Sequence, residues 1–155
     1  MKFGKVARLV GAALMISAVG LAAVAVAADD PITARRAVMK GNGGAAKTIG
    51  GFMDGSVPFD AAKAAEAAMS ISKGGHEFAS NFDALFPDSS KTGDTHANPV
   101  IWDNKDDFKA KAAALEADAG AASTAAATGA DAFKAAAGKM FGNCKGCHEK
   151  YRLAM

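Results

Sequence analysis

The sequence contains few of the residues that β-sheets are made from. Its 155 residues include one Tyr and one Trp, and apolar and polar residues rarely alternate. Alanine and lysine are common instead, and alanine is the best helix former. Proline, which interrupts helices, occurs only four times. We therefore expect an all-α fold.

Cysteine is also scarce. The only two cysteines, Cys144 and Cys147, are followed directly by His148. The pattern Cys-x-x-Cys-His is the attachment sequence of a c-type haem. Two thiols at this spacing on one helix can each add to a vinyl group of the same porphyrin, and the adjacent imidazole can bind the iron. The motif predicts one haem c, held by thioethers at Cys144 and Cys147 and ligated by His148.

Other interpretations of this motif are a disulfide, half of a zinc site or a thioredoxin-like redox pair. A structural zinc site needs four protein ligands, and the remaining candidates, His76 and His96, lie on separate predicted segments. A thioredoxin-like pair would follow a strand–helix unit, which the pattern does not contain. An exported chain could oxidise its two cysteines to a disulfide, but the histidine that follows them favours haem attachment.

Residues 1–28 have the pattern of a secretory signal peptide that is cleaved. Three basic residues precede an apolar run over 9–26, and an Ala-Val-Ala cleavage site lies at 25–27. An uncleaved membrane anchor is the alternative, but the small residues and the acids after them favour cleavage. We expect a mature protein that starts at Ala28 or Asp29, forms one domain over 29–155 and is exported to the periplasm.

The mature chain carries almost no net charge. Without the three basic residues of the leader, fifteen basic residues face sixteen acidic ones, which is a net charge of about −1. This balance gives no reason to expect nucleic-acid binding or a stable association with an anionic membrane.

Helix signals divide the mature chain into four helices. The first begins at Asp30-Pro31 and ends near Gly55. The second begins at Asp60, and Gly74-Gly75 either ends it or weakens it locally. A long connection covers about 81–104. The third helix begins near Asp103-Asn104, and Thr128-x-x-Asp131 resembles a capping box for the fourth. We expect a left-handed antiparallel four-helix bundle with the cofactor in its interior.

The fourth helix should turn both cysteines toward the core. Its apolar residues recur at steps of three and four and form one stripe: Phe133, Ala137, Met140, Cys144, Cys147 and Tyr151. His148 borders this stripe and can reach the iron. On the first helix, Gly41, Gly43 and Gly44 would permit the close approach of a neighbour or ligand.

The chain resembles the class II cytochromes c, which comprise cytochrome c' and the low-spin cytochromes of the c-556 type. The similarity is strongest over residues 142–152, which contain the haem motif near the C-terminus, and moderate over 32–40. In the middle of the chain only Pro58-Phe59-Asp60, Leu85-Phe86-Pro87 and Ile101-Trp102 stand out.

The resemblance implies a second axial ligand. In this family, the residue four positions after an arginine of the first helix faces the iron, and here Met39 follows Arg35 by four. In cytochrome c' that residue is usually apolar or aromatic, whereas in the low-spin branch it is a methionine. The resemblance therefore implies His148–iron–Met39 coordination, with Arg35 paired to a haem propionate.

These features together predict a periplasmic electron carrier that meets redox partner proteins, and the resemblance adds a possible homodimer through the first two helices. The alternative is a five-coordinate, cytochrome c'-like protein that binds nitric oxide or carbon monoxide, and Met39 argues against it. A peroxidase-like enzyme would need a distal acid–base group. The first helix offers only Arg35, Arg36 and Lys40 for that role, so we expect no enzyme.

Overall fold

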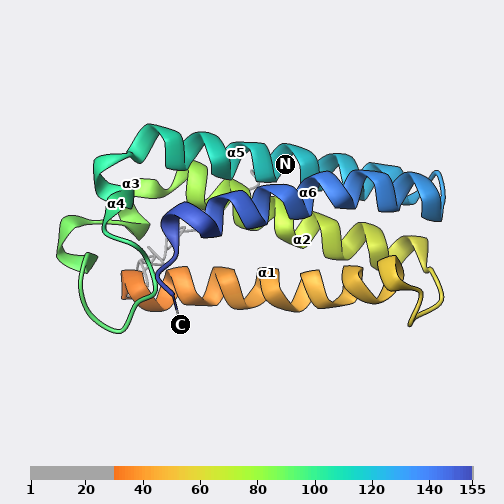
Figure 1. The fold of residues 1–155 in the computed structure, drawn as a ribbon, viewed down its shortest axis with the longest axis horizontal. Helices are drawn as coiled ribbons and strands as arrows, with labels where there is room; N and C mark the ends of the chain where they lie inside the picture. Colours follow the sequence, from red (N-terminus) through yellow and green to blue (C-terminus); the bar gives the residue numbers. More distant parts are fainter. Residues whose placement is uncertain (1–29, 155) are drawn as a thin grey trace, which may run out of the picture.

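The protein is a bundle of four long antiparallel helices in the computed structural model, which describes residues 30–154 (Figure 1). The long helices are α1 (Pro31–Asp54), α2 (Ala61–Ser80), α5 (Lys105–Ala126) and α6 (Ala130–Tyr151). Short helical turns divide the connection between α2 and α5, namely α3 (Phe82–Leu85), the 3₁₀ turn η1 (Asp88–Ser90) and α4 (Val100–Asp103). The predicted all-α bundle is confirmed.

Residues 30–154 form no β-strand, only an isolated antiparallel bridge between Ala97 and Arg152. The predicted leader lies outside the described residues. None of the helices between residues 30 and 154 is both long and apolar enough to cross a membrane.

Local capping interactions explain where α1 and α2 begin. The side chain of Asp30 accepts a hydrogen bond from the Thr33 amide at 2.9 Å, and that of Asp60 accepts one from the Lys63 amide at 3.0 Å. Gly55 ends α1 with a φ of 78°, a conformation that glycine adopts without strain. These three helix ends agree with the sequence prediction.

The predicted capping box of the fourth helix is wrong. Gly129, with a φ of 131°, is the N-cap residue of α6, and no side chain caps the helix. Thr128 therefore lies one position before the cap, where its hydroxyl is out of register with the first free amides. The positive φ of Gly129 decides this start.

The bundle has two hydrophobic clusters along its axis. We call the first the lower cluster; it contains Ile49, Phe52, Ile71, Phe133 and Met140 together with small residues of α2 and α5. The second, the aromatic cluster, lies at the end where the α2–α5 connection folds back, and it comprises Phe78, Phe82, Leu85, Phe86, Ile101, Trp102, Phe108, Ala112 and Tyr151. The aromatic cluster therefore covers the end of the bundle where α1 begins and α6 ends (Figure 1).

Glycines of α2, not those of α1, permit the closest helix packing. Gly74 and Gly75 are both buried, and α2 continues through them to Ser80. A Cβ at Gly74 would lie 2.3 Å from Oδ1 of Asn42 on α1. Around Gly41, Gly43 and Gly44 no atom lies within 4 Å of such a Cβ. The close approach that we expected at the α1 glycines thus occurs on α2, and Gly74-Gly75 does not end this helix.

Candidate functional site

The residues of the Cys-x-x-Cys-His motif occupy the last two turns of α6. Both thiols are free and half-buried. Cys144 packs against the lower cluster and Cys147 against the aromatic cluster. The predicted core stripe of α6 is therefore confirmed, and the two sulfur atoms lie where the two clusters meet.

The electrostatic surroundings keep the motif uncharged. Burial raises the pKa of the Cys144 thiol, and it raises that of Cys147 to about 11 despite the opposing charge of Lys111. Burial, helped by the charge of Arg152, lowers the pKa of His148 below its ordinary value of 6.5. The imidazole is therefore neutral at neutral pH, which is the form that binds a metal. Two thiols and one neutral imidazole on adjoining turns fit the attachment of one haem c.

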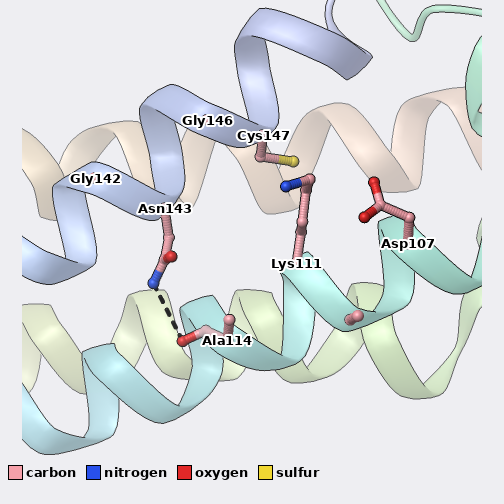
Figure 2. Close-up of a pocket in the computed structure, with 8 residues that line it drawn as sticks. Asp107, Lys111, Ala114, Gly142, Asn143, Gly146 and Cys147 are labelled. Carbon is pink, nitrogen blue, oxygen red and sulfur yellow. Dashed lines mark hydrogen bonds between the residues drawn. The ribbon is translucent and has the colours of Figure 1, made fainter.

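Cys147 also borders an open groove between α5 and α6. The groove has a volume of about 430 Å³ and is lined by Asp107, Ala110, Lys111, Ala114, Gly142, Asn143, Gly146 and Cys147. Figure 2 shows the Cys147 sulfur and the Lys111 ammonium group pointing toward one another across it. The Asn143 amide spans the two helices, donating to the Ala114 carbonyl at 3.3 Å and to Oδ2 of Asp118 at 2.8 Å. The groove brings solvent close to the second sulfur.

Asp107 joins the start of α5 to the end of α6. Its Oδ2 accepts hydrogen bonds from the Tyr151 hydroxyl at 2.5 Å and from Nζ of Lys150 at 2.9 Å. These two donors lower the pKa of Asp107 below its ordinary value of 3.8. The sequence does not reveal this role of Asp107, because an exposed Asp in the first turn of a helix has no pattern of its own.

The backbone after His148 is tied to the long connection. The Asn98 amide donates to the Tyr151 carbonyl at 2.9 Å, and the Leu153 amide donates to the His96 carbonyl at 2.8 Å. These bonds accompany the isolated bridge at Ala97 and Arg152. The connection thus fixes the end of α6 one turn beyond His148.

Met39 is half-buried on α1 and packs against the aromatic cluster, as Cys147 does. The helices α1 and α6 contact each other at few positions, since α1 packs mainly on α2 and α6 mainly on α5. The structure therefore brings Met39 and the haem motif to the same apolar cluster from two different helices. Coordination of iron by Met39 stays a prediction.

Arg35 is buried, with 5% of its surface exposed, and its partners lie in the long connection. Nη1 donates to the Leu85 carbonyl at 2.7 Å and to Oγ of Ser90 at 2.8 Å. Nη2 donates to the Ser90 carbonyl at 3.1 Å and to Oγ1 of Thr95 at 3.2 Å. Pairing of Arg35 with a propionate stays a prediction, and these contacts are an arrangement that the sequence did not reveal.

Comparison with known proteins identifies the family. The family model described as Cytochrome C' matches residues 30–152. The chain is 40% identical to a cytochrome c' of Rhodopseudomonas palustris over 134 residues, covering 83% of this chain and 85% of the relative. It is 38% identical to a cytochrome c-556 of Agrobacterium fabrum over 133 residues, covering 86% and 88%.

A solved structure agrees with these two matches. The cytochrome c' from Rhodopseudomonas palustris superimposes with a TM-score of 0.74 at 36% identity, covering 81% of this chain and 97% of that one. The family model, the relatives and the fold all point to the same group of proteins. The chain therefore belongs to the cytochrome c' family, the c-type cytochromes that carry one covalently attached haem c.

Proposed function

We propose that this cytochrome is an electron carrier whose iron has His148 and Met39 as axial ligands. The observation that carries the proposal is the position of Met39, which lies on α1 and packs against the same aromatic cluster as Cys147 on α6. A relative named cytochrome c-556 at 38% identity supports it as well.

Each residue of the site has a distinct part in this function. When bound, the haem supplies an iron that gains and loses one electron. Cys144 and Cys147 hold the porphyrin at two points, and the neutral His148 imidazole provides the first axial ligand. A thioether opposite the imidazole raises the reduction potential. The aromatic cluster provides the apolar surface against which Cys147 and Met39 pack.

One observation favours a second function, the binding of nitric oxide or carbon monoxide at a five-coordinate iron. The relative at 40% identity is named cytochrome c'. In this alternative Met39 would be a packing residue.

Replacement of Met39 by Leu separates the two functions. Leu keeps the size and helix propensity of Met and removes the sulfur, so a Met-to-Leu exchange costs less than ~1.5 kcal/mol of packing energy. Met53 is also half-buried on α1, but it packs against the lower cluster. Met53→Leu is therefore the matched control.

The readouts are the visible spectrum of both oxidation states and the rate of carbon monoxide binding. We expect a low-spin wild-type protein and a low-spin Met53→Leu variant, both slow to bind gas because the sulfur must first leave the iron. Met39→Leu should become five-coordinate and bind gas readily. A high-spin wild-type protein, or a Met39→Leu variant with unchanged spectrum and gas binding, would reject the electron-carrier function in favour of gas binding.

The location and partners of the protein follow from the same proposal. An exported electron carrier would work in the periplasm and meet redox proteins in small, transient contacts. Its role is to pass electrons without turning over a substrate. A homodimer through α1 and α2 is compatible with this role, and sedimentation of the haem-containing protein tests it.

A further inference from the structure

Arg35 is a buried cation whose partners are neutral. Its four hydrogen bonds from Nη1 and Nη2 reach two backbone carbonyls and two hydroxyls. Within residues 30–154 the guanidinium forms no ion pair with a carboxylate. A buried charge is costly unless hydrogen bonds replace its hydration, so this dense set of acceptors indicates a specific role for Arg35.

The flat faces of the guanidinium are also in contact. The Arg35 Cζ lies 4.7 Å from the ring centre of Phe86 and 5.7 Å from that of Trp102. The Trp102 indole donates to the Phe86 carbonyl at 2.8 Å. The terminal nitrogens of Arg35 thus bind the connection, and its guanidinium plane lies over two rings of the aromatic cluster. Lysine has no planar group and cannot reproduce this arrangement.

The neighbouring Arg36 shows what an ordinary surface arginine does at this place. It forms an ion pair with Asp94 of the same connection, with 58% and 84% of the two side chains exposed. Exposed pairs of this kind contribute little to stability. Arg35 and Arg36 therefore provide a matched pair, with the same charge, the same helix and the same partner segment but different burial.

The contacts of Arg35 continue to the end of the haem helix. We call residues 85–98 the strap. Thr95 Oγ1, which accepts from Arg35, also accepts from the Ala97 amide at 3.1 Å. The Asn98 amide then donates to the Tyr151 carbonyl, and the His96 carbonyl accepts from the Leu153 amide. A continuous series of bonds thus joins Arg35, one turn before Met39, to the backbone one turn after His148.

We propose that Arg35 is a positioning residue that clamps the strap between α1 and α6 and thereby sets the position of Met39 relative to His148. The part concerning Met39 rests on the proposed function. Both terminal nitrogens of Arg35 are engaged with the strap, which leaves only Nε–H for an anion.

The experiment compares Arg35→Met with Arg36→Met in the haem-containing protein. Arg35→Lys keeps the positive charge but loses the planar guanidinium with its two terminal nitrogens. Thr95→Val removes the one Arg35 hydrogen bond that leads on to Ala97 and leaves the bonds to Leu85 and Ser90 and the buried charge in place. It therefore replaces Arg35→Met if that variant fails to fold. The readouts are hydrogen exchange at the Asn98 and Leu153 amides, the low-spin fraction of the iron and the reduction potential.

We expect exchange at both amides to accelerate about tenfold or more in Arg35→Met, the effect of losing hydrogen bonds from a buried charged group. The low-spin fraction and the reduction potential should fall in Arg35→Met and Thr95→Val. Arg36→Met should match the wild type in all three readouts, and Arg35→Lys should lie between the two.

Two results would overturn the proposal. If Arg35→Met and Arg36→Met lose the same amide protection, or none, the clamp does not exist. The second result concerns the iron. If amide exchange accelerates in Arg35→Met but this variant keeps the low-spin spectrum and the reduction potential of the wild type, Arg35 does not position Met39. If the iron of the wild-type protein is high-spin, the proposed function is rejected, and so is the part of this proposal that concerns Met39. Hydrogen exchange at the Asn98 and Leu153 amides then tests by itself whether Arg35 clamps the strap.

Discussion

Gly75 on α2 meets the backbone of Glu116 on α5 with no room for a side chain. A Cβ on Gly75 would lie 2.7 Å from the Glu116 amide nitrogen and 2.8 Å from the Ala112 carbonyl oxygen. Both contacts are with backbone atoms, which cannot rotate away as a side chain can. One turn earlier on α2, the Ser72 hydroxyl donates to the Glu116 carbonyl at 2.9 Å. This crossing therefore fixes the separation of the two helices.

Gly75→Ala should lower the free energy of unfolding. Forcing a methyl group into a filled contact costs about 1–3 kcal/mol, which exceeds the gain in helix propensity of ~1 kcal/mol over most of that range. Urea unfolding of the haem-containing protein, followed by circular dichroism, measures the change.

Gly138→Ala on α6 is the control for this substitution. Gly138 is exposed, and a Cβ added to it would have no atom within 4 Å. This variant should be more stable than the wild type by about 0.5–1 kcal/mol, because alanine lowers the backbone entropy of the unfolded chain. Equal effects of the two substitutions would mean that the α2–α5 crossing is not closely packed.

The haem should remain with the polypeptide after denaturation. The half-buried Cys144 and Cys147 thiols lie on adjoining turns of α6, and each is expected to form a thioether. Extraction of denatured protein with acid–organic solvent should leave the colour in the protein. A variant with both cysteines replaced by alanine should lose the colour to the solvent, and colour that leaves the wild type would contradict covalent attachment.

The bond network at Asp107 should make stability depend on acid pH. Because the folded protein lowers the pKa of Asp107 below 3.8, the unfolded chain binds this proton more readily. The network therefore stabilises the protein above the unfolded pKa, and the stabilisation is lost as pH falls through 3.8 toward the folded value.

Asp107→Asn tests this dependence. The urea midpoint of the variant should lie below that of the wild type at neutral pH, and the two should converge as pH falls below 3.8. Asp106→Asn, at the exposed neighbouring position, controls for the loss of one negative charge from the first turn of α5. A difference between Asp107→Asn and the wild type that does not change with pH would exclude the carboxylate as its source.

Export should remove the first residues of the chain. The pattern over residues 1–28 predicts a mature protein that begins at Ala28 or Asp29. Mass spectrometry of the periplasmic protein determines this start directly. Intact Met1 on membrane-bound protein would contradict both the cleavage and the periplasmic location.

Several features depended on local sequence, and these were predictable. The caps at Asp30 and Asp60 act within three residues, so α1 and α2 begin where the sequence indicates. The stripe of α6 was equally clear, because its apolar residues recur at steps of three and four. The spacing of Cys144, Cys147 and His148 carried the cofactor prediction, since it matches one porphyrin on one helix.

The alanine-rich helix α2 shows where such patterns fail. Met69 is 41% exposed, whereas Ala64, Ala68 and Ile71 are buried. Alanine occurs on every face of this helix, so periodicity alone cannot choose the buried one. The choice is made by Gly74 and Gly75, which allow α1 and α5 to come close on one side only.

The sequence by itself therefore determined the helical class, the starts of α1 and α2, and the haem motif, because each depends on residues within one or two turns of each other. Only the tertiary structure decided the partners of Arg35, since Leu85, Ser90 and Thr95 are fifty to sixty residues away from it. The spacing to Met39 singles out Arg35 from Arg36, but it does not show which segment of the chain covers either residue. The fold distinguishes them by placing the connection, with its carbonyl and hydroxyl oxygens, against one side of α1.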